Sequence, residues 1–158
     1  MENYMKLEIA ALGENEGFAR SAVAAFALPL NPTLSELSDI KTAVSEAVTN
    51  CIVHAYAKKD GENKIYIECR SEKSTDGIGG LLHIKITDFG CGIEDVNKAV
   101  LPFYTTQARE ERSGMGFTIM QTFMTGFSLR SEQGKGTSVF MSKRIGMQAE
   151  SERDRADA

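Results

Sequence analysis

The sequence carries a carboxylate and an amide at helical spacing, Glu46 and Asn50, in the run Glu46-Ala-Val-Thr-Asn50. Residues four apart on an α-helix differ by about 40° around its axis, so both side chains are expected on one side of a helix. A carboxylate can accept a proton as a general base, and an amide oxygen can coordinate Mg²⁺. The alternative is that the pair belongs to an ordinary solvent-exposed polar helix face.

Asp88 continues the alternating apolar positions Leu82, Ile84 and Ile86. Side chains two residues apart in a strand share a face, so this carboxylate is expected on the apolar face of its strand. A buried carboxylate needs a partner. One interpretation is a cap for the glycine-containing turn at 90–92, because Asp bonds readily to nearby backbone. The other is an acceptor for a ligand donor such as an exocyclic amine.

Gly114 and Gly116 stand immediately before an expected helix start. Glycines there expose backbone N–H groups, and a helix N-terminus favours an anion, so phosphate binding is one interpretation. A simple loop-to-helix turn is the other. Arg109 and Arg112 lie just upstream and are suited to a phosphate clamp.

Several other motif-based interpretations are excluded by their surroundings. Asp88-Phe89-Gly90 matches a tripeptide of eukaryotic-type protein kinases, but the Gly-rich loop, strand lysine and catalytic-loop motif of that fold are missing from the sequence. There is also no GxxxxGK[ST] phosphate-binding loop. Three cysteines without a CxxC pair and two histidines argue against a zinc site, and free thiols suit a reducing, cytoplasmic compartment.

The composition is that of one globular domain. The chain has 158 residues, of which 42% are hydrophobic and 25% charged, with a net charge of −4. The acidic balance argues against nucleic acid or an anionic membrane surface as the main partner. No secretory signal or membrane-spanning apolar run is visible in the sequence. We expect a single domain over residues 1–146, followed by a charged, disordered tail over residues 147–158.

The elements that must position these residues follow from apolar periodicity. Alternation predicts strands, and spacings of three and four predict helices. The strands are expected over 6–12, 64–70, 81–88, 127–131 and 138–145, and the helices over 15–28, 33–56, 94–100 and 116–125. Hairpin-paired strands with helices on one side predict an α+β two-layer sandwich, with a loop over 101–113.

The first two helices carry more detailed expectations. The capping-box pattern Thr33-Leu-Ser-Glu36 predicts the start of the second helix. In the first helix, one apolar face is expected to unite four residues, and Arg20 is expected on the opposite, outer face beside Ala24 and Ala27. The four residues of that expected face are Phe18, Ala22, Ala25 and Phe26.

In chain order, four segments resemble the motifs of the Bergerat-fold (GHKL) ATPases, the family of histidine kinases, gyrase and heat-shock chaperones. They are Glu46–Asn50, Asp88-x-Gly-x-Gly92, Gly114-x-Gly116 and Gly134-Lys-Gly-Thr137. Longer segments such as ENEGFAR, IKTAVSEAVTNCIVHAY, PFYTTQ and ERSGMGFTIM resemble the anti-sigma-factor serine kinases of that family, over about residues 6–145. Gln107 departs from the lysine that such relatives commonly carry.

The resemblance implies a Bergerat-type two-layer sandwich, with a mixed or antiparallel sheet, that binds ATP and Mg²⁺. It implies that Asp88 accepts from the adenine amine, that Asn50 holds the metal and that Glu46 is the catalytic base. It also implies that Arg112 approaches the γ-phosphate and that Arg20 contacts protein partners. The other implied nucleotide-binding residues are Gly90, Gly92, Thr105, Thr106, Gly114, Met115, Gly116 and Thr137.

The implied function is that of a cytoplasmic, homodimeric protein serine kinase and anti-sigma factor. Such a protein inhibits a sporulation sigma factor of RNA polymerase and phosphorylates a serine of an anti-anti-sigma protein. One alternative is an ATP-dependent module that sequesters its partner without kinase activity. The other is a detached histidine-kinase catalytic domain, which is disfavoured because the expected elements include no separate domain with a phospho-accepting histidine. His54 lies on the nucleotide helix itself, after the Glu46–Asn50 motif.

Overall fold

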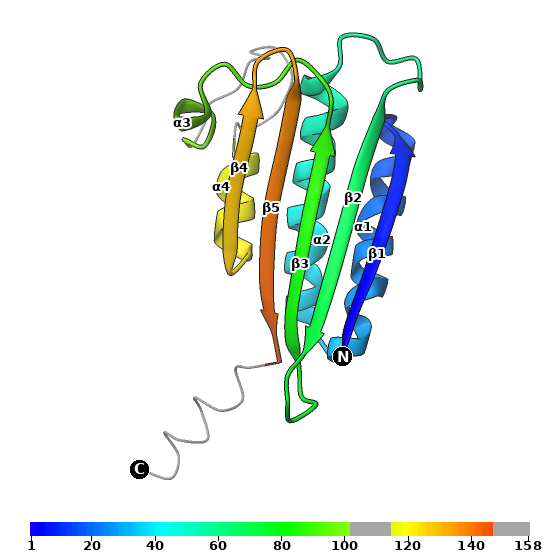
Figure 1. Ribbon diagram of the computed structural model, residues 1–158, viewed down its shortest axis with the longest axis vertical. Helices are drawn as coiled ribbons and strands as arrows, with labels where there is room; N and C mark the ends of the chain where they lie inside the picture. The colour runs from blue at the N-terminus through cyan, green and yellow to red at the C-terminus, as the bar shows by residue number, and fades with distance from the viewer. Residues whose placement is uncertain (102–114, 147–158) are drawn as a thin grey trace.

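The computed structural model describes residues 1–101 and 115–146. Within these ranges the strands form a five-stranded sheet in the order β1-β2-β3-β5-β4, in which every neighbouring pair is antiparallel (Figure 1). The strands are β1 (Glu2–Ala10), β2 (Lys64–Lys73), β3 (Gly80–Asp88), β4 (Gly126–Glu132) and β5 (Gly136–Ile145). The expected α+β fold is confirmed, and its sheet is antiparallel.

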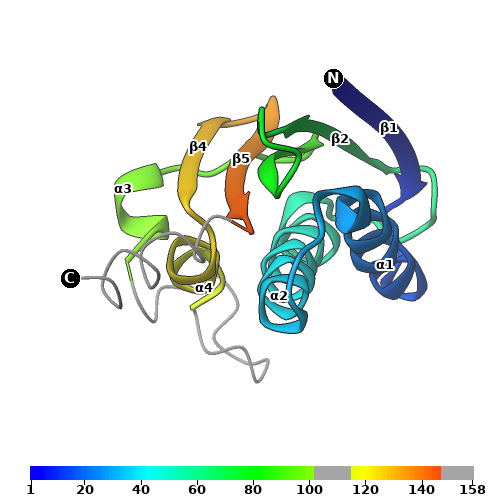
Figure 2. The ribbon, with the colours of Figure 1, turned by 90° about the horizontal axis from the view of Figure 1, so that it is seen from below.

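The helices α1, α2 and α4 lie together on one face of this sheet, whereas α3 lies beside β4 (Figure 2). The sheet therefore forms one layer and these three helices form the other, as the hairpins and amphipathic helices of the sequence predict. No helix in the described ranges is long and apolar enough to span a bilayer. The helices are α1 (Glu16–Ala27), α2 (Leu34–Asn50), α3 (Val96–Ala99) and α4 (Gly116–Phe123), with a π-helical extension of α2 over Cys51–Ala55 and 3₁₀ turns at Gly13–Asn15 and Leu28–Leu30.

The N-terminal strand starts earlier than its apolar alternation predicts. β1 begins at Glu2 because the whole strand pairs with β2, with Glu2 opposite Glu72 and Ala10 opposite Lys64. Backbone hydrogen bonding to a neighbouring strand does not require apolar side chains, so the polar first residues join the sheet.

The capping box at the start of α2 is confirmed. The Thr33 N–H donates to Glu36 Oε2 at 2.8 Å, and the Glu36 N–H donates to Thr33 Oγ1 at 3.1 Å. The second carboxylate oxygen of Glu36 accepts the N–H of Gly146, just beyond β5, at 3.1 Å. Glu36 is buried, so this carboxylate both starts the helix and joins it to the last strand.

We expect Glu36→Ala to lower the free energy of unfolding by about 1–3 kcal/mol, because it removes a cap and leaves the N–H groups of Thr33 and Gly146 without their acceptor. Chemical denaturation of the variant measures this loss. Glu14→Ala, at an exposed position outside this network, is the matched control. Equal losses of stability in the two variants would contradict the assigned role of Glu36.

The predicted apolar face of α1 is wrong except for Phe26, which is partly buried against the core. The buried residues are Ala19, Val23, Ala24 and Ala27, whereas the Phe18 side chain is 56% exposed. The prediction followed the largest apolar side chains, but α1 packs closely against α2, and small side chains permit that approach. The expected outer face beside Arg20 is wrong for the same reason, since Ala24 and Ala27 are buried while Arg20 is exposed.

Candidate functional site

Glu46 and Asn50 on α2 lie against the first residue of α4. A Cβ added to Gly116 would stand 3.1 Å from Glu46 Oε2 and 3.4 Å and 3.5 Å from Asn50 Nδ2 and Oδ1. Both polar side chains are half-buried. The tertiary structure therefore joins a carboxylate, an amide and a helix N-terminus that are far apart in the sequence, and the pair does not belong to a freely solvated helix face.

Asp88 is buried at the end of β3, with 4% of its surface exposed, so the expected inward placement is confirmed. Its Oδ1 accepts the N–H of Gly90 at 3.0 Å, which is the turn-capping bond. Burial raises the pKa of the Asp88 carboxyl, while hydrogen bonds from Gly90, the Cys51 thiol and the Thr137 backbone act in the opposite direction. Turn capping therefore coexists with a carboxylate that is well placed to accept from a ligand.

Cys51 is the inner neighbour of this carboxylate. Burial and the nearby Asp88 charge raise the pKa of the Cys51 thiol, so it stays protonated and donates to Asp88. Cys51 directly follows Asn50. Its hydrogen bond to Asp88 therefore connects the helix that carries Asn50 to the strand that carries Asp88.

The turn after Asp88 depends on two glycines. A Cβ at Gly90 would stand 2.1 Å from the carbonyl oxygen of Ala55, and a Cβ at Gly92 would stand 2.2 Å from that of Glu132. Gly92 also has a φ of +72°, a conformation that glycine adopts without strain. The turn thus packs closely against both the end of the α2 extension and the β4–β5 hairpin.

Thr137 lies opposite Asp88 in the register of β3 and β5. Its Oγ1 is 2.8 Å from Ser131 Oγ on β4, which also accepts the N–H of Ile93 at 2.8 Å and donates to the carbonyl of Gly136 at 3.0 Å. The sequence analysis missed Ser131. A hydroxyl at an inward-facing position of an alternating strand is the signal that would have indicated it.

Lys143 of the sheet connects α2 to the end of α4. Lys143 on β5 extends its Nζ to 2.9 Å from Asp39 Oδ2 on α2 and donates to the carbonyl oxygen of Phe123 at the end of α4. The Lys143 side chain is 13% exposed, so the pair is little screened by water. This contact holds α4 beside α2, where Gly116 meets Glu46.

The chain matches the family described as the histidine kinase-like ATPase domain over residues 9–143. It belongs to this family. The family and the α+β fold that the sequence resemblance predicted are thereby confirmed.

This histidine kinase-like ATPase is similar to proteins named anti-sigma F factor. It is 52% identical to that of Caldanaerobacter subterraneus subsp. tengcongensis over 144 residues, covering 91% of this chain and 95% of the relative. It is also 52% identical to that of Clostridium botulinum (strain Eklund 17B / Type B) over 145 residues, covering 91% and 96%. Among solved structures, the RsbU and RsbW domains of a Mycobacterium tuberculosis protein share the fold, with a TM-score of 0.60 at 15% identity over 90% of this chain and 32% of theirs.

The residues of this ATPase domain fit a Mg²⁺-nucleotide. Asp88 offers a buried acceptor at one end of the site, and the α4 N-terminus favours phosphates at the other. Within the described ranges, no group of three or more His, Cys, Asp or Glu side chains is placed to hold a metal. An ion at Asn50 would therefore take most of its ligands from phosphate oxygens and water, which is usual for Mg²⁺.

Some predicted residues fall outside the described ranges. Thr105, Thr106, Arg112 and Gly114 lie there, as do Gln107, most of the expected 101–113 loop and the tail 147–158. Met115 is described and half-buried immediately before α4.

Arg20 is placed on α1, where its Nη1 lies 3.3 Å from Glu16 Oε2. The same Glu16 carboxylate accepts the Ser45 hydroxyl of α2, one residue before Glu46. Arg20 therefore lies at the seam between α1 and α2, with 45% of its side chain exposed.

Proposed function

We propose that this protein is an ATP-dependent anti-sigma factor and a protein serine kinase. The observation that carries the kinase proposal is the convergence of Glu46 and Asn50 on Gly116 at the start of α4. The names of the relatives at about half identity support the anti-sigma role. We propose residues 1–146 as a single ATP-binding kinase domain, followed by the charged tail.

In this proposal the buried Asp88 carboxylate accepts a hydrogen bond from the adenine amine, with Thr137 beside it in the register. The Asn50 amide oxygen holds Mg²⁺, which neutralises phosphate charge when bound. The backbone N–H groups at the start of α4 receive the phosphates, because they are the helix donors without an intrahelical partner. The end of β3 thereby holds the adenine of ATP, and the start of α4 holds its phosphates.

The proposed chemical step is phosphoryl transfer to a serine. The serine hydroxyl oxygen bonds to the γ-phosphorus, the bond from that phosphorus to the β–γ bridging oxygen breaks, and ADP leaves. Glu46 takes the hydroxyl proton, since a carboxylate beside the phosphate-binding helix end is placed for general-base catalysis. Positioning and charge neutralisation supply most of the acceleration. Arg112 is expected to approach the γ-phosphate.

The proposed partners are an RNA polymerase sigma factor of the sporulation type and an anti-anti-sigma protein that carries the phosphorylated serine. A homodimer acting in the cytoplasm, where RNA polymerase works, is part of the proposal.

The test combines the purified protein with γ-labelled ATP, Mg²⁺ and the candidate anti-anti-sigma protein encoded beside it. Transfer of label to a serine supports the kinase. Binding of the sigma factor without any transfer would instead support the ATP-dependent sequestering module. Transfer of label to a histidine of a separate protein, in place of a serine, would support the detached histidine-kinase domain.

We expect the sigma factor to bind the ATP form more tightly than the ADP form, by roughly 5–150-fold if the coupling is of ordinary size. The reason is that a nucleotide shifts partner affinity only as far as its γ-phosphate discriminates between two states of the protein. Titrations of the sigma factor under ATP, ADP and no nucleotide measure the ratio. Equal affinities under ATP and ADP would eliminate the nucleotide switch.

Arg20→Glu tests the partner-binding surface separately from the nucleotide site, because it is expected to weaken partner binding without changing nucleotide affinity.

A further inference from the structure

The hydroxyl of Tyr56 joins three elements beside the candidate site. It donates to the carbonyl oxygen of Lys64 at the start of β2, at 2.7 Å, and accepts the N–H of Phe89 at 2.8 Å. Phe89 is the residue directly after Asp88, and Tyr56 directly follows the π-helical extension of α2. One side chain therefore uses both its donor and its acceptor to tie the α2 extension to β2 and to the turn after β3.

The backbone around Tyr56 reinforces this junction. The Cys91 N–H donates to the carbonyl oxygen of Ala55 at 2.7 Å. The Cys91 thiol lies 3.2 Å from the carbonyl oxygen of His54. Lys59 Nζ donates to the carbonyl oxygens of Val53 at 3.1 Å and Tyr56 at 2.6 Å, as well as to that of Ile52. The end of the helix that carries Asn50 is thus bonded directly to the turn that follows Asp88.

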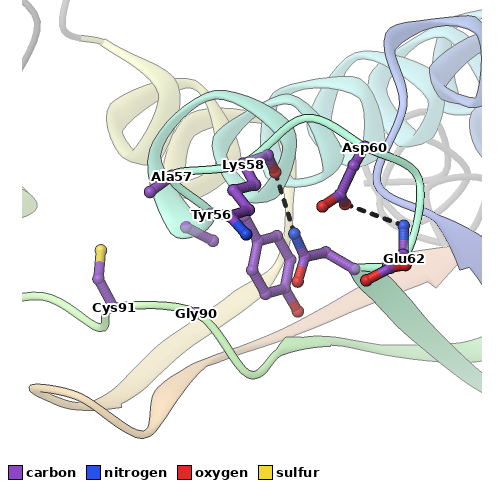
Figure 3. A pocket seen from close by; sticks show the side chains of 9 residues that line it. Tyr56, Ala57, Lys58, Asp60, Glu62, Gly90 and Cys91 are labelled. Atoms are coloured by element: carbon purple, nitrogen blue, oxygen red, sulfur yellow. Dashed lines mark hydrogen bonds between the residues drawn. The ribbon is translucent and has the colours of Figure 1, made fainter.

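The Tyr56 ring borders a surface hollow of about 380 Å³ (Figure 3). Figure 3 shows the ring between the end of the α2 extension and the Gly90–Cys91 turn. The hollow is lined by Ala55, Tyr56, Ala57, Lys58, Asp60, Glu62, Asn63, Gly90 and Cys91. The residue packs partly against the core on its other side, and the two hydrogen bonds of its hydroxyl add to that packing in setting the position of the ring.

Burial raises the pKa of the Tyr56 hydroxyl, although the bond from Phe89 acts in the opposite direction. The group is therefore protonated at neutral pH and keeps its donor for Lys64. The junction is intact across the physiological pH range.

We propose that Tyr56 is a positioning residue for adenine recognition. Asp88 and Asn50 have to stand at a fixed separation to hold the two ends of one nucleotide, and the Tyr56 hydroxyl fixes the backbone one residue from Asp88 relative to the helix of Asn50. This proposal rests on the proposed ATP-binding function and adds a residue to it. In this proposal the Tyr56 hydroxyl acts through the Phe89 backbone and not on the nucleotide.

The test is Tyr56→Phe, which removes the hydroxyl and keeps the ring. Calorimetry compares the affinity for ATP with that for purine riboside triphosphate, which lacks the exocyclic amine that Asp88 would accept. We expect ATP affinity to fall by about five- to tenfold, the size of one lost hydrogen bond, while the affinity for the amine-free analogue stays the same. Tyr66→Phe is the matched control, since the Tyr66 ring contacts Phe89 edge-on, with centroids 5.5 Å apart, and not through its hydroxyl.

Unchanged ATP affinity, or an equal loss for both nucleotides together with a lower melting temperature, would overturn the proposal in favour of a purely structural tyrosine. Hydrogen exchange in the nucleotide-free protein supplies a second measurement. The Phe89 amide should exchange faster in Tyr56→Phe, while the Ile84 amide in the middle of β3 is unchanged; an unchanged Phe89 rate would also overturn the proposal. Failure of the wild-type protein to bind ATP contradicts the proposed function instead, and hydrogen exchange then still decides whether Tyr56 holds the turn.

Discussion

Asp88→Asn should lower the affinity for ATP by about 5- to 150-fold while the protein stays folded. In the proposed site the buried Asp88 carboxylate accepts from the adenine amine, and a charge-assisted hydrogen bond with its desolvated partner contributes on the order of 1–3 kcal/mol. An asparagine oxygen can still accept the Gly90 N–H, so the turn keeps its cap.

The measurement is calorimetric titration of Mg-ATP into the variant, with the melting temperature as the test of folding. Asp76→Asn, which changes an exposed aspartate in the β2–β3 connection at the other end of β3, is the control and should bind as the wild type does. Wild-type affinity in a folded Asp88→Asn protein would remove Asp88 from adenine recognition.

The pH dependence of the same site has a defined sign. Because burial raises the folded-state pKa of Asp88, the carboxyl takes up its proton at a higher pH than an ordinary aspartate. A group whose folded pKa is raised favours folding when protonated and costs stability once pH rises above that pKa. Acidification should therefore weaken ATP binding earlier than an ordinary aspartate would, without weakening the fold through Asp88. The binding profile of Asp88→Asn should lack this step.

Glu46→Gln should abolish phosphorylation of the anti-anti-sigma protein while Mg-ATP and the sigma factor still bind. The substitution keeps the size of the side chain against Gly116 but removes its basicity, and general-base catalysis contributes typically 10²–10⁴-fold. Rate assays with labelled ATP at saturating nucleotide measure the loss, and calorimetry measures the retained binding.

Glu14→Gln, at an exposed position outside the site, is the control for the change of charge. A wild-type transfer rate in Glu46→Gln would reduce Glu46 to a polar residue of the helix. Loss of ATP binding together with activity would instead assign it a role in holding the nucleotide.

Local sequence patterns determined which strand side chains are buried, where α2 begins and which helix residues share one side. Period-two alternation predicted the shared apolar face of Leu82, Ile84 and Ile86 and placed Asp88 on it, because side chains of a strand alternate whatever the strand pairs with. The capping box located the start of α2, since its two bonds involve residues only three apart. Helical spacing likewise put Glu46 and Asn50 on one side of α2.

Only the tertiary structure decided which of these residues meet. The burial of Ala24 and Ala27 depends on how closely α1 approaches α2, which the hydrophobicity of α1 by itself does not specify. The contacts of Gly116 with Glu46, and of the Tyr56 hydroxyl with Phe89, join residues dozens of positions apart. Periodicity depends on the geometry of a single element, whereas such contacts depend on the packing of several elements, so no local pattern carries them.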